Sequence, residues 1–162
     1  MSGHTSGRRL ALCLACLLVT AAAASAQESV TVGLPASVLF NVGTQSTVTG
    51  NPAPTSVTFS NVTVAPGRVL RISVMANASA FGGSQGSSYP ASAVSWTTTN
   101  ASGGIGTNGT LSSSSYTQVF QSYELTPSGG FDLTWTLDPS SGTPRAGNQT
   151  LSLRWKIESV QP

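Results

Sequence analysis

Apolar and polar residues alternate with a period of two over much of the chain, and this pattern predicts β-strands. The clearest instances are residues 131–137 and 151–158, where every second side chain is large and apolar. Such a strand buries one face in a core and leaves the other face in water. After residue 27, no window repeats apolar residues at the three- and four-residue spacing of an amphipathic helix. We therefore expect an all-β fold.

Weaker alternation predicts additional strands earlier in the chain. They cover residues 30–34, 57–64, 68–76, 94–96 and 116–123. In the second of these the phase slips at Ser60 and Asn61, as a β-bulge would produce. The second and third are joined by an Ala-Pro-Gly turn, in which proline presets one backbone angle and glycine accepts a positive φ. We expect these two strands to pair as a hairpin.

Stretches rich in glycine, serine and asparagine separate these strands. Residues 81–90 form one of them, and residues 99–115 form a second that is long for a loop in a compact domain. Two alternatives stay open for the second stretch, namely a hairpin with a weak strand near Thr110 and Leu111, or a mobile surface loop. Residues 138–149 contain two prolines and two glycines, which predicts a loop.

About seven to nine short strands with no helices between them predict an antiparallel two-sheet sandwich, of the immunoglobulin-like or jelly-roll kind. We expect it to form a single domain over residues 27–162, a size that suits one hydrophobic core. A closed barrel is the alternative architecture.

The first 26 residues have the three parts of a signal peptide. Two arginines precede an apolar run over residues 10–24, and Ala24 and Ala26 provide the small residues of a cleavage site before Gln27. The apolar run is too short for a comfortable membrane span, so we expect none in the mature chain. A buried N-terminal helix and a lipid anchor on Cys16 are the alternatives. The sequence thus predicts a secreted, periplasmic or cell-surface protein.

Removal of this leader changes the charge and the available chemistry. The leader contains both cysteines, the single histidine and two of the seven basic residues. The mature chain then carries five basic and five acidic residues and has no net charge, which gives no reason to expect binding to nucleic acid or to an anionic membrane. A cysteine-free exported domain of 136 residues, behind an alanine-rich leader, favours a bacterial source.

The lack of histidine and cysteine in the mature chain excludes several kinds of site. It removes serine and cysteine nucleophiles that depend on histidine, and the usual nitrogen and sulfur ligands of zinc, copper or iron. No phosphate-binding glycine motif occurs, so we expect no cofactor and no metal. A pair formed by Glu124 and Asp132 across adjacent strands would suit a hydrolase, but solvated surface charge is the favoured interpretation. We do not expect an enzyme.

The aromatic residues divide into two groups. Trp96, Trp135 and Trp155 fall on the apolar phase of their strands, which predicts that they pack in the core. Three tyrosines lie in or beside polar stretches, where an exposed ring is able to stack on a sugar. These candidate glycan-binding residues are Tyr89, Tyr116 and Tyr123.

The last third of the chain contains two similar motifs, Leu-Thr-Trp-Thr-Leu at residues 133–137 and Leu-Arg-Trp-Lys-Ile at residues 153–157. Over about thirty residues they resemble the closing strands of bacterial secreted sandwich domains, among them the WxL cell-wall-binding, spore-coat-U and pilus-subunit-like families. The resemblance implies wall binding or pilus assembly. The chain departs from the WxL pattern because its two motifs are close together and Ile157 replaces leucine, and it departs from pilus subunits because the mature chain has no disulfide.

These observations favour a non-catalytic structural or interaction protein of the bacterial surface, as a matrix, pilus-like or adhesin component. Residues 28–34 alternate, so this segment is able to pair with its own sheet or to add to the edge of a neighbouring protein's sheet. Self-association or binding to another surface protein would follow. A secreted carbohydrate-binding module is the first alternative, and a hydrolase is the second.

Overall fold

The computed structural model describes residues 27–43, 46–83, 89–143 and 149–162. The expected signal peptide lies outside these residues. The described chain consists of strands, loops and two short 3-10 turns, Ala91–Ala93 and Pro139–Ser141. None of the helical segments in these four ranges is long and apolar enough to cross a membrane.

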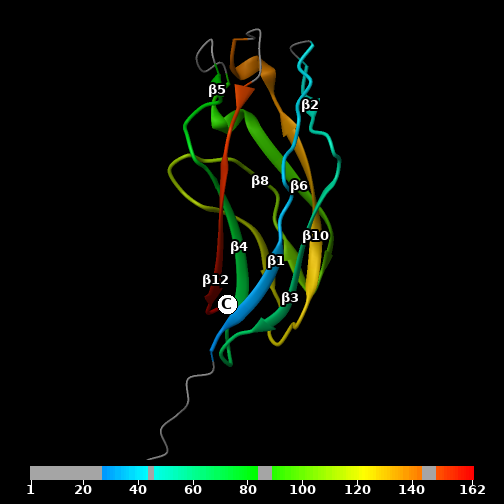
Figure 1. The fold of residues 1–162 in the computed structure, drawn as a ribbon, viewed down its shortest axis with the longest axis vertical. Coiled ribbons are helices and arrows are strands. Elements are labelled where there is room, and N and C mark those ends of the chain that lie inside the picture. The colour runs from blue at the N-terminus through cyan, green and yellow to red at the C-terminus, as the bar shows by residue number, and fades with distance from the viewer. Residues whose placement is uncertain (1–26, 44–45, 84–88, 144–148) are drawn as a thin grey trace, which may run out of the picture.

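Two antiparallel sheets pack against each other to form a sandwich (Figure 1). The first, here called the β10 sheet, has the order β1 (Ser29–Gly33), β3 (Thr55–Thr63), β10 (Gly129–Leu137), β6 (Val94–Ser102) and β8 (Gly109–Thr110), and β2 (Val48–Thr49) pairs with the end of β10. The second, the β4 sheet, has the order β12 (Leu153–Val160), β4 (Val69–Ala76), β9 (Thr117–Ser122) and β7 (Gly104–Gly106). A small ladder joins β5 (Gly82–Gly83) to β11 (Gln149–Thr150). The predicted all-β sandwich is confirmed, and the closed barrel is not formed.

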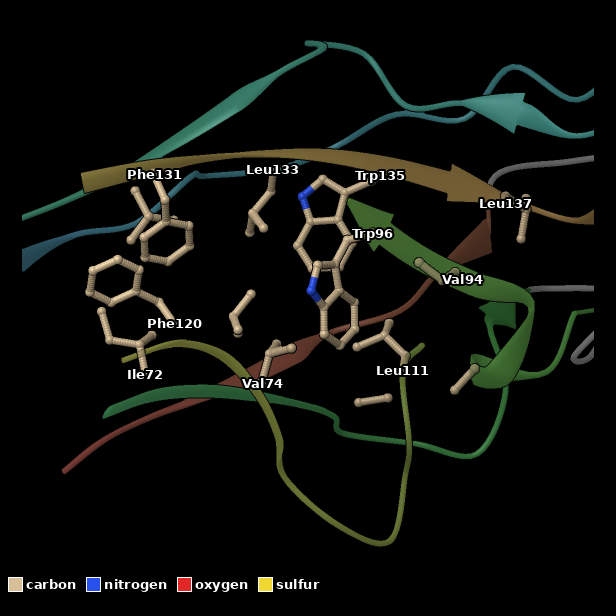
Figure 2. Close-up of a cluster of buried hydrophobic side chains, with 14 of the residues drawn as sticks. Ile72, Val74, Val94, Trp96, Leu111, Phe120, Phe131, Leu133, Trp135 and Leu137 are labelled. Atoms are coloured by element: carbon tan, nitrogen blue, oxygen red, sulfur yellow. The ribbon is translucent and has the colours of Figure 1, made fainter. Parts of the chain in front are cut away.

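The core lies between the sheets and follows the period-two pattern of the sequence. Every second residue of β10 is buried, from Phe131 to Leu137, and Figure 2 shows these side chains meeting those of the opposite sheet. The rings of Phe131 and Phe120 stack with their centroids 4.8 Å apart. Burial of each large side chain contributes about 1.5–3 kcal/mol, so this double layer is the main stabilising feature of the fold.

The two buried tryptophans find hydrogen-bond partners inside the sandwich. The Trp135 Nε1–H donates to Thr55 Oγ1 at 3.0 Å, and the Thr55 hydroxyl donates to the backbone oxygen of Leu133 at 3.1 Å. The Trp96 Nε1–H donates to the backbone oxygen of Thr107 at 2.8 Å. Because a buried donor without a partner costs about 1–3 kcal/mol, these bonds make tryptophan acceptable in the core.

The predicted hairpin of residues 57–64 with 68–76 is wrong. Both segments are strands, but β3 pairs with β1 and β10, whereas β4 pairs with β12 and β9. The intervening turn, with Gly67 at φ 74°, carries the chain from one sheet to the other. The physical reason is that Phe59 and Ile72 belong to apolar faces that are buried against each other only if the strands lie in opposite layers.

Two finer expectations hold. Ser29 pairs with Thr63 whereas Thr31 pairs with Ser60, so β3 has one extra residue at the predicted bulge. Asn61 accommodates it at φ 53°, a conformation that asparagine tolerates better than most residues. Of the two alternatives for residues 99–115, the weak strand near Thr110 is present, as β8, which pairs with β6.

Candidate functional site

The three candidate tyrosines do not form one site. Tyr89 is only 6% exposed, because its ring packs edge-on against Phe81 at 6.3 Å between centroids. It is therefore a core residue and offers no surface to a sugar. Tyr116 and Tyr123 are 40% and 57% exposed, and they flank β9 at its opposite ends.

The two candidate carboxylates also lie apart in the fold. Asp132 is on β10, whereas Glu124 follows β9, and these strands belong to different sheets. Asp132 accepts hydrogen bonds from Asn100 Nδ2 at 2.7 Å and from Ser56 Oγ at 2.6 Å, which hold its pKa below the usual value. A glycosidase acid needs a raised pKa and a facing carboxylate, whereas the pKa of Asp132 is lowered and Glu124 follows a strand of the other sheet. In the described ranges, no three acidic, histidine or cysteine residues are grouped as metal ligands.

An apolar groove of about 860 Å³ opens between the two sheets along one side of the sandwich. One wall is the segment 34–42, which follows β1, and the other is the segment 149–153 with Trp155 of β12. Core side chains such as Trp135 and Leu111 also line it, and none of its lining residues is charged. The groove thus gives access from the surface to the apolar interior.

The groove borders a free sheet edge. All eight residues of β12 pair with β4, from Leu153 opposite Ala76 to Val160 opposite Val69. On its other side, no strand in the described part of the chain pairs with β12. Backbone N–H and C=O groups on the unpaired side of an edge strand are available to pair with another extended segment. The edge and the groove together therefore form the candidate site.

The apolar face of β12 is only partly covered. Leu153, Trp155 and Ile157 point toward the core, yet each remains half-buried. The prediction that all three tryptophans pack in the core therefore holds fully for Trp96 and Trp135 and only partly for Trp155. Half-buried side chains at a sheet edge gain free energy when an additional segment covers them.

At the other end of β12, a polar cluster ties the two sheets together. The Glu28 carboxylate accepts hydrogen bonds from the backbone N–H of Ala65 at 2.9 Å and from Ser159 Oγ at 2.8 Å. Arg68 Nε lies 3.6 Å from the same carboxylate oxygen and donates to Ser159 Oγ at 2.8 Å. The Ala65 and Ser159 bonds, helped by the Arg68 charge, lower the pKa of Glu28.

Sequence reasoning missed the segment 34–42 as a wall of the groove. The pattern was available, because Val38, Phe40 and Val42 alternate with more polar or exposed positions and all three pack against the core. Leu39 points outward and makes only a single bridge, to Asn51. The segment therefore has the period of a strand without forming a continuous ladder.

No protein-family model, no curated protein and no solved structure matches this chain.

Proposed function

We propose that the protein is a non-catalytic structural or interaction protein, exported to the bacterial cell surface, that takes up an extended segment of a partner beside β12. The observation that carries this proposal is the free edge of β12 next to the uncharged groove. It favours a matrix, pilus-like or adhesin component over an enzyme. The absence of histidine and cysteine after residue 26 is in keeping with this role.

An added strand would be held in two ways. Its backbone groups would pair with those of β12, which supplies affinity without sequence preference. Its alternate side chains would enter the groove and cover Leu153 and Trp155, which supplies specificity. Because the groove is lined by uncharged residues, a charged side chain at an inward position would lose its hydration without finding a partner. The incoming segment should therefore carry uncharged side chains at every second position, and apolar ones would cover Leu153 and Trp155.

The chain contains a segment of this kind. In residues 28–34, Val30, Val32 and Leu34 alternate with polar or small residues. In the structure Val30 and Val32 are half-buried, and β1 pairs with β3 over only five residues, with an irregular register. We therefore propose a second copy of the chain, offering residues 28–34, as the partner.

The test is binding of a synthetic 28–34 peptide to the mature protein, residues 27–162. Trp155 is the one half-buried tryptophan, so acrylamide should quench its fluorescence more than that of Trp96 or Trp135. We expect the peptide to reduce this quenching. Leu153→Glu, which places a charge in the groove, should abolish the protection.

Arg154→Glu is the control, since it introduces the same carboxylate on the same strand but on the exposed side, and it changes the net charge by two units against one for Leu153→Glu. It should leave protection of Trp155 unchanged. Analytical ultracentrifugation of the mature protein should show concentration-dependent association that Leu153→Glu removes. A protein that stays monomeric and gives no Trp155 protection would contradict the proposal.

A further inference from the structure

We propose that the outer face of the β4 sheet binds an acidic polysaccharide, through Arg71, Arg154, Lys156 and the ring of Tyr116. This surface lies on the opposite side of the β4 sheet from the core and the groove. The proposal therefore goes beyond strand addition and does not depend on it.

The register of the sheet places the cationic side chains on one face. Trp155 and Ile157 pair with Val74 and Ile72 and point toward the core. Their neighbours along β12, Arg154 and Lys156, consequently point outward, because successive side chains of a strand alternate between faces.

Arg71 joins them from the next strand. It lies opposite Glu158 on one side and opposite Gln121 of β9 on the other. Since Glu158 is two residues beyond Lys156, it belongs to the same outward set. The outer face of the β4 sheet therefore carries Arg154 and Lys156 on β12 and Arg71 on the neighbouring strand β4.

The distribution of charge separates this face from the rest of the molecule. Of the four basic residues in the described ranges, Arg68 belongs to the Glu28 cluster and the other three lie on this face. Within the described strands of the β4 sheet Glu158 is the only carboxylate, whereas Asp132 lies on the outer face of the β10 sheet among serine and threonine. The face is thus cationic in a mature chain without net charge, and it complements an anion.

The two arginines have capacity for a ligand. Arg154 is exposed. Arg71 donates from Nη2 to Gln121 Oε1 at 3.4 Å, and its Nε is buried without a hydrogen-bond partner in the described chain. Since Arg71 Nε is covered, its terminal guanidinium nitrogens and those of the exposed Arg154 are the groups that can reach a carboxylate on a ligand.

Tyr116 adds a second kind of contact. Its ring is 40% exposed, and Lys156 Nζ lies 5.8 Å from the ring centroid. An exposed ring packs against the apolar face of a sugar, and the neighbouring ammonium group is positioned to pair with an acidic substituent on that sugar. An aromatic ring beside cations is the combination expected for a polymer of acidic sugars such as a polyuronate.

Lys156 already forms an ion pair in the free protein. Its Nζ lies 2.7 Å from Glu158 Oε2, so this carboxylate competes with an anionic ligand. Replacing Glu158 with glutamine removes a negative charge that would repel an anionic ligand, and it releases Lys156 from its ion pair. Glu158→Gln should therefore increase the affinity for an acidic polymer.

The experiment measures binding of the mature protein to polygalacturonate, with dextran as the neutral polymer, by affinity electrophoresis and calorimetry. We expect binding to polygalacturonate that weakens with added salt, and no binding to dextran. The double variant R154Q/K156Q should lose roughly tenfold or more in affinity, and E158Q should gain about two- to fivefold. Tyr116→Ala should also bind more weakly, whereas Tyr116→Phe should retain affinity.

The matched control is T58E/T97E, which changes the net charge by the same two units on exposed positions of the β10 sheet. It should leave binding almost unchanged. Loss of affinity in T58E/T97E equal to that in R154Q/K156Q would overturn the proposal. So would failure to bind polygalacturonate, equal binding to dextran, or equal binding to duplex DNA or vesicles of anionic lipid.

Discussion

The gap between the sheets is filled differently at the two ends of β12. At the C-terminal end of β12, the carboxylate of Glu28 and the guanidinium of Arg68 bind Ser159 and join β1, the turn after β3 and β12. At the N-terminal end, the segment 34–42 and β12 leave an apolar groove between them. One end is therefore closed by polar bonds, and the other is open.

This difference shows at which end of β12 the binding of an additional segment would be favourable. The polar groups at the closed end have partners, so an additional chain would have to displace existing bonds there. At the open end, Leu153 and Trp155 are half-buried and the edge of β12 is free. Covering them would add apolar burial at about 25 cal/mol per Å². A partner is thus expected at the open end.

The largest expected effect compares two tryptophans on opposite sides of the groove. Trp135→Ala should lower the free energy of unfolding by about 3–5 kcal/mol, because Trp135 is buried and its Nε1–H is bonded to Thr55. Trp155→Ala should cost about half as much, since Trp155 is only partly buried. Urea denaturation of both variants measures the difference. Equal costs would mean that the groove is closed in solution.

Removal of β1 should have the next largest effect. A mature chain that starts at residue 35 loses the Glu28 bonds and the half-buried Val30 and Val32, so we expect a loss of about 2–4 kcal/mol in stability. Adding the 28–34 peptide in trans should restore part of that stability, and a peptide with both valines changed to serine should not. Unaltered stability and unaltered association of the shortened chain would contradict strand exchange.

The smallest expected effect concerns the pH dependence of the closed end. Because the pKa of folded Glu28 is lowered below 4.5, this group stabilises the fold above pH 4.5, and that contribution is lost as the pH falls through the folded pKa. Glu28→Gln should be slightly less stable than the wild type at pH 7 and should converge with it in thermal melts once the pH is below the folded pKa of Glu28. Asp132 and Asp138 also have lowered pKa values, so both proteins should lose stability in acid. A difference in stability between the two proteins that stays constant with pH would show that the ionisation of Glu28 does not contribute to the pH dependence.

The sequence predicted the strands well and their partners less well. A period of two shows which residues share a face, and it correctly places Phe131 and Trp135 in the core. It does not show which sheet a strand joins, and for this reason the expected hairpin of β3 with β4 was wrong. Tyr89 sits among polar neighbours in the sequence but is buried against the ring of Phe81.

The candidate site was less predictable, since it depends on what is absent from one edge. The sequence around Trp155 does not reveal that β12 is an edge strand, paired with β4 on one side and with no described strand on the other. The cationic face is a different case. The alternation of Arg154 and Lys156 with apolar residues was visible, but their proximity to Arg71 and Tyr116 required the register of the sheet.

The contact between Glu28 and Ser159 also fixes the relation of the two chain ends. Because these residues lie 2.8 Å apart at their oxygens, the start and the end of residues 27–162 emerge at the same pole of the molecule (Figure 1). A short linker from residue 162 back to residue 27 should therefore give a circular permutant that folds. For the same reason, a fluorescent fusion at the C-terminal end would sit away from the groove and from residues 28–34, and would report on assembly without obstructing it.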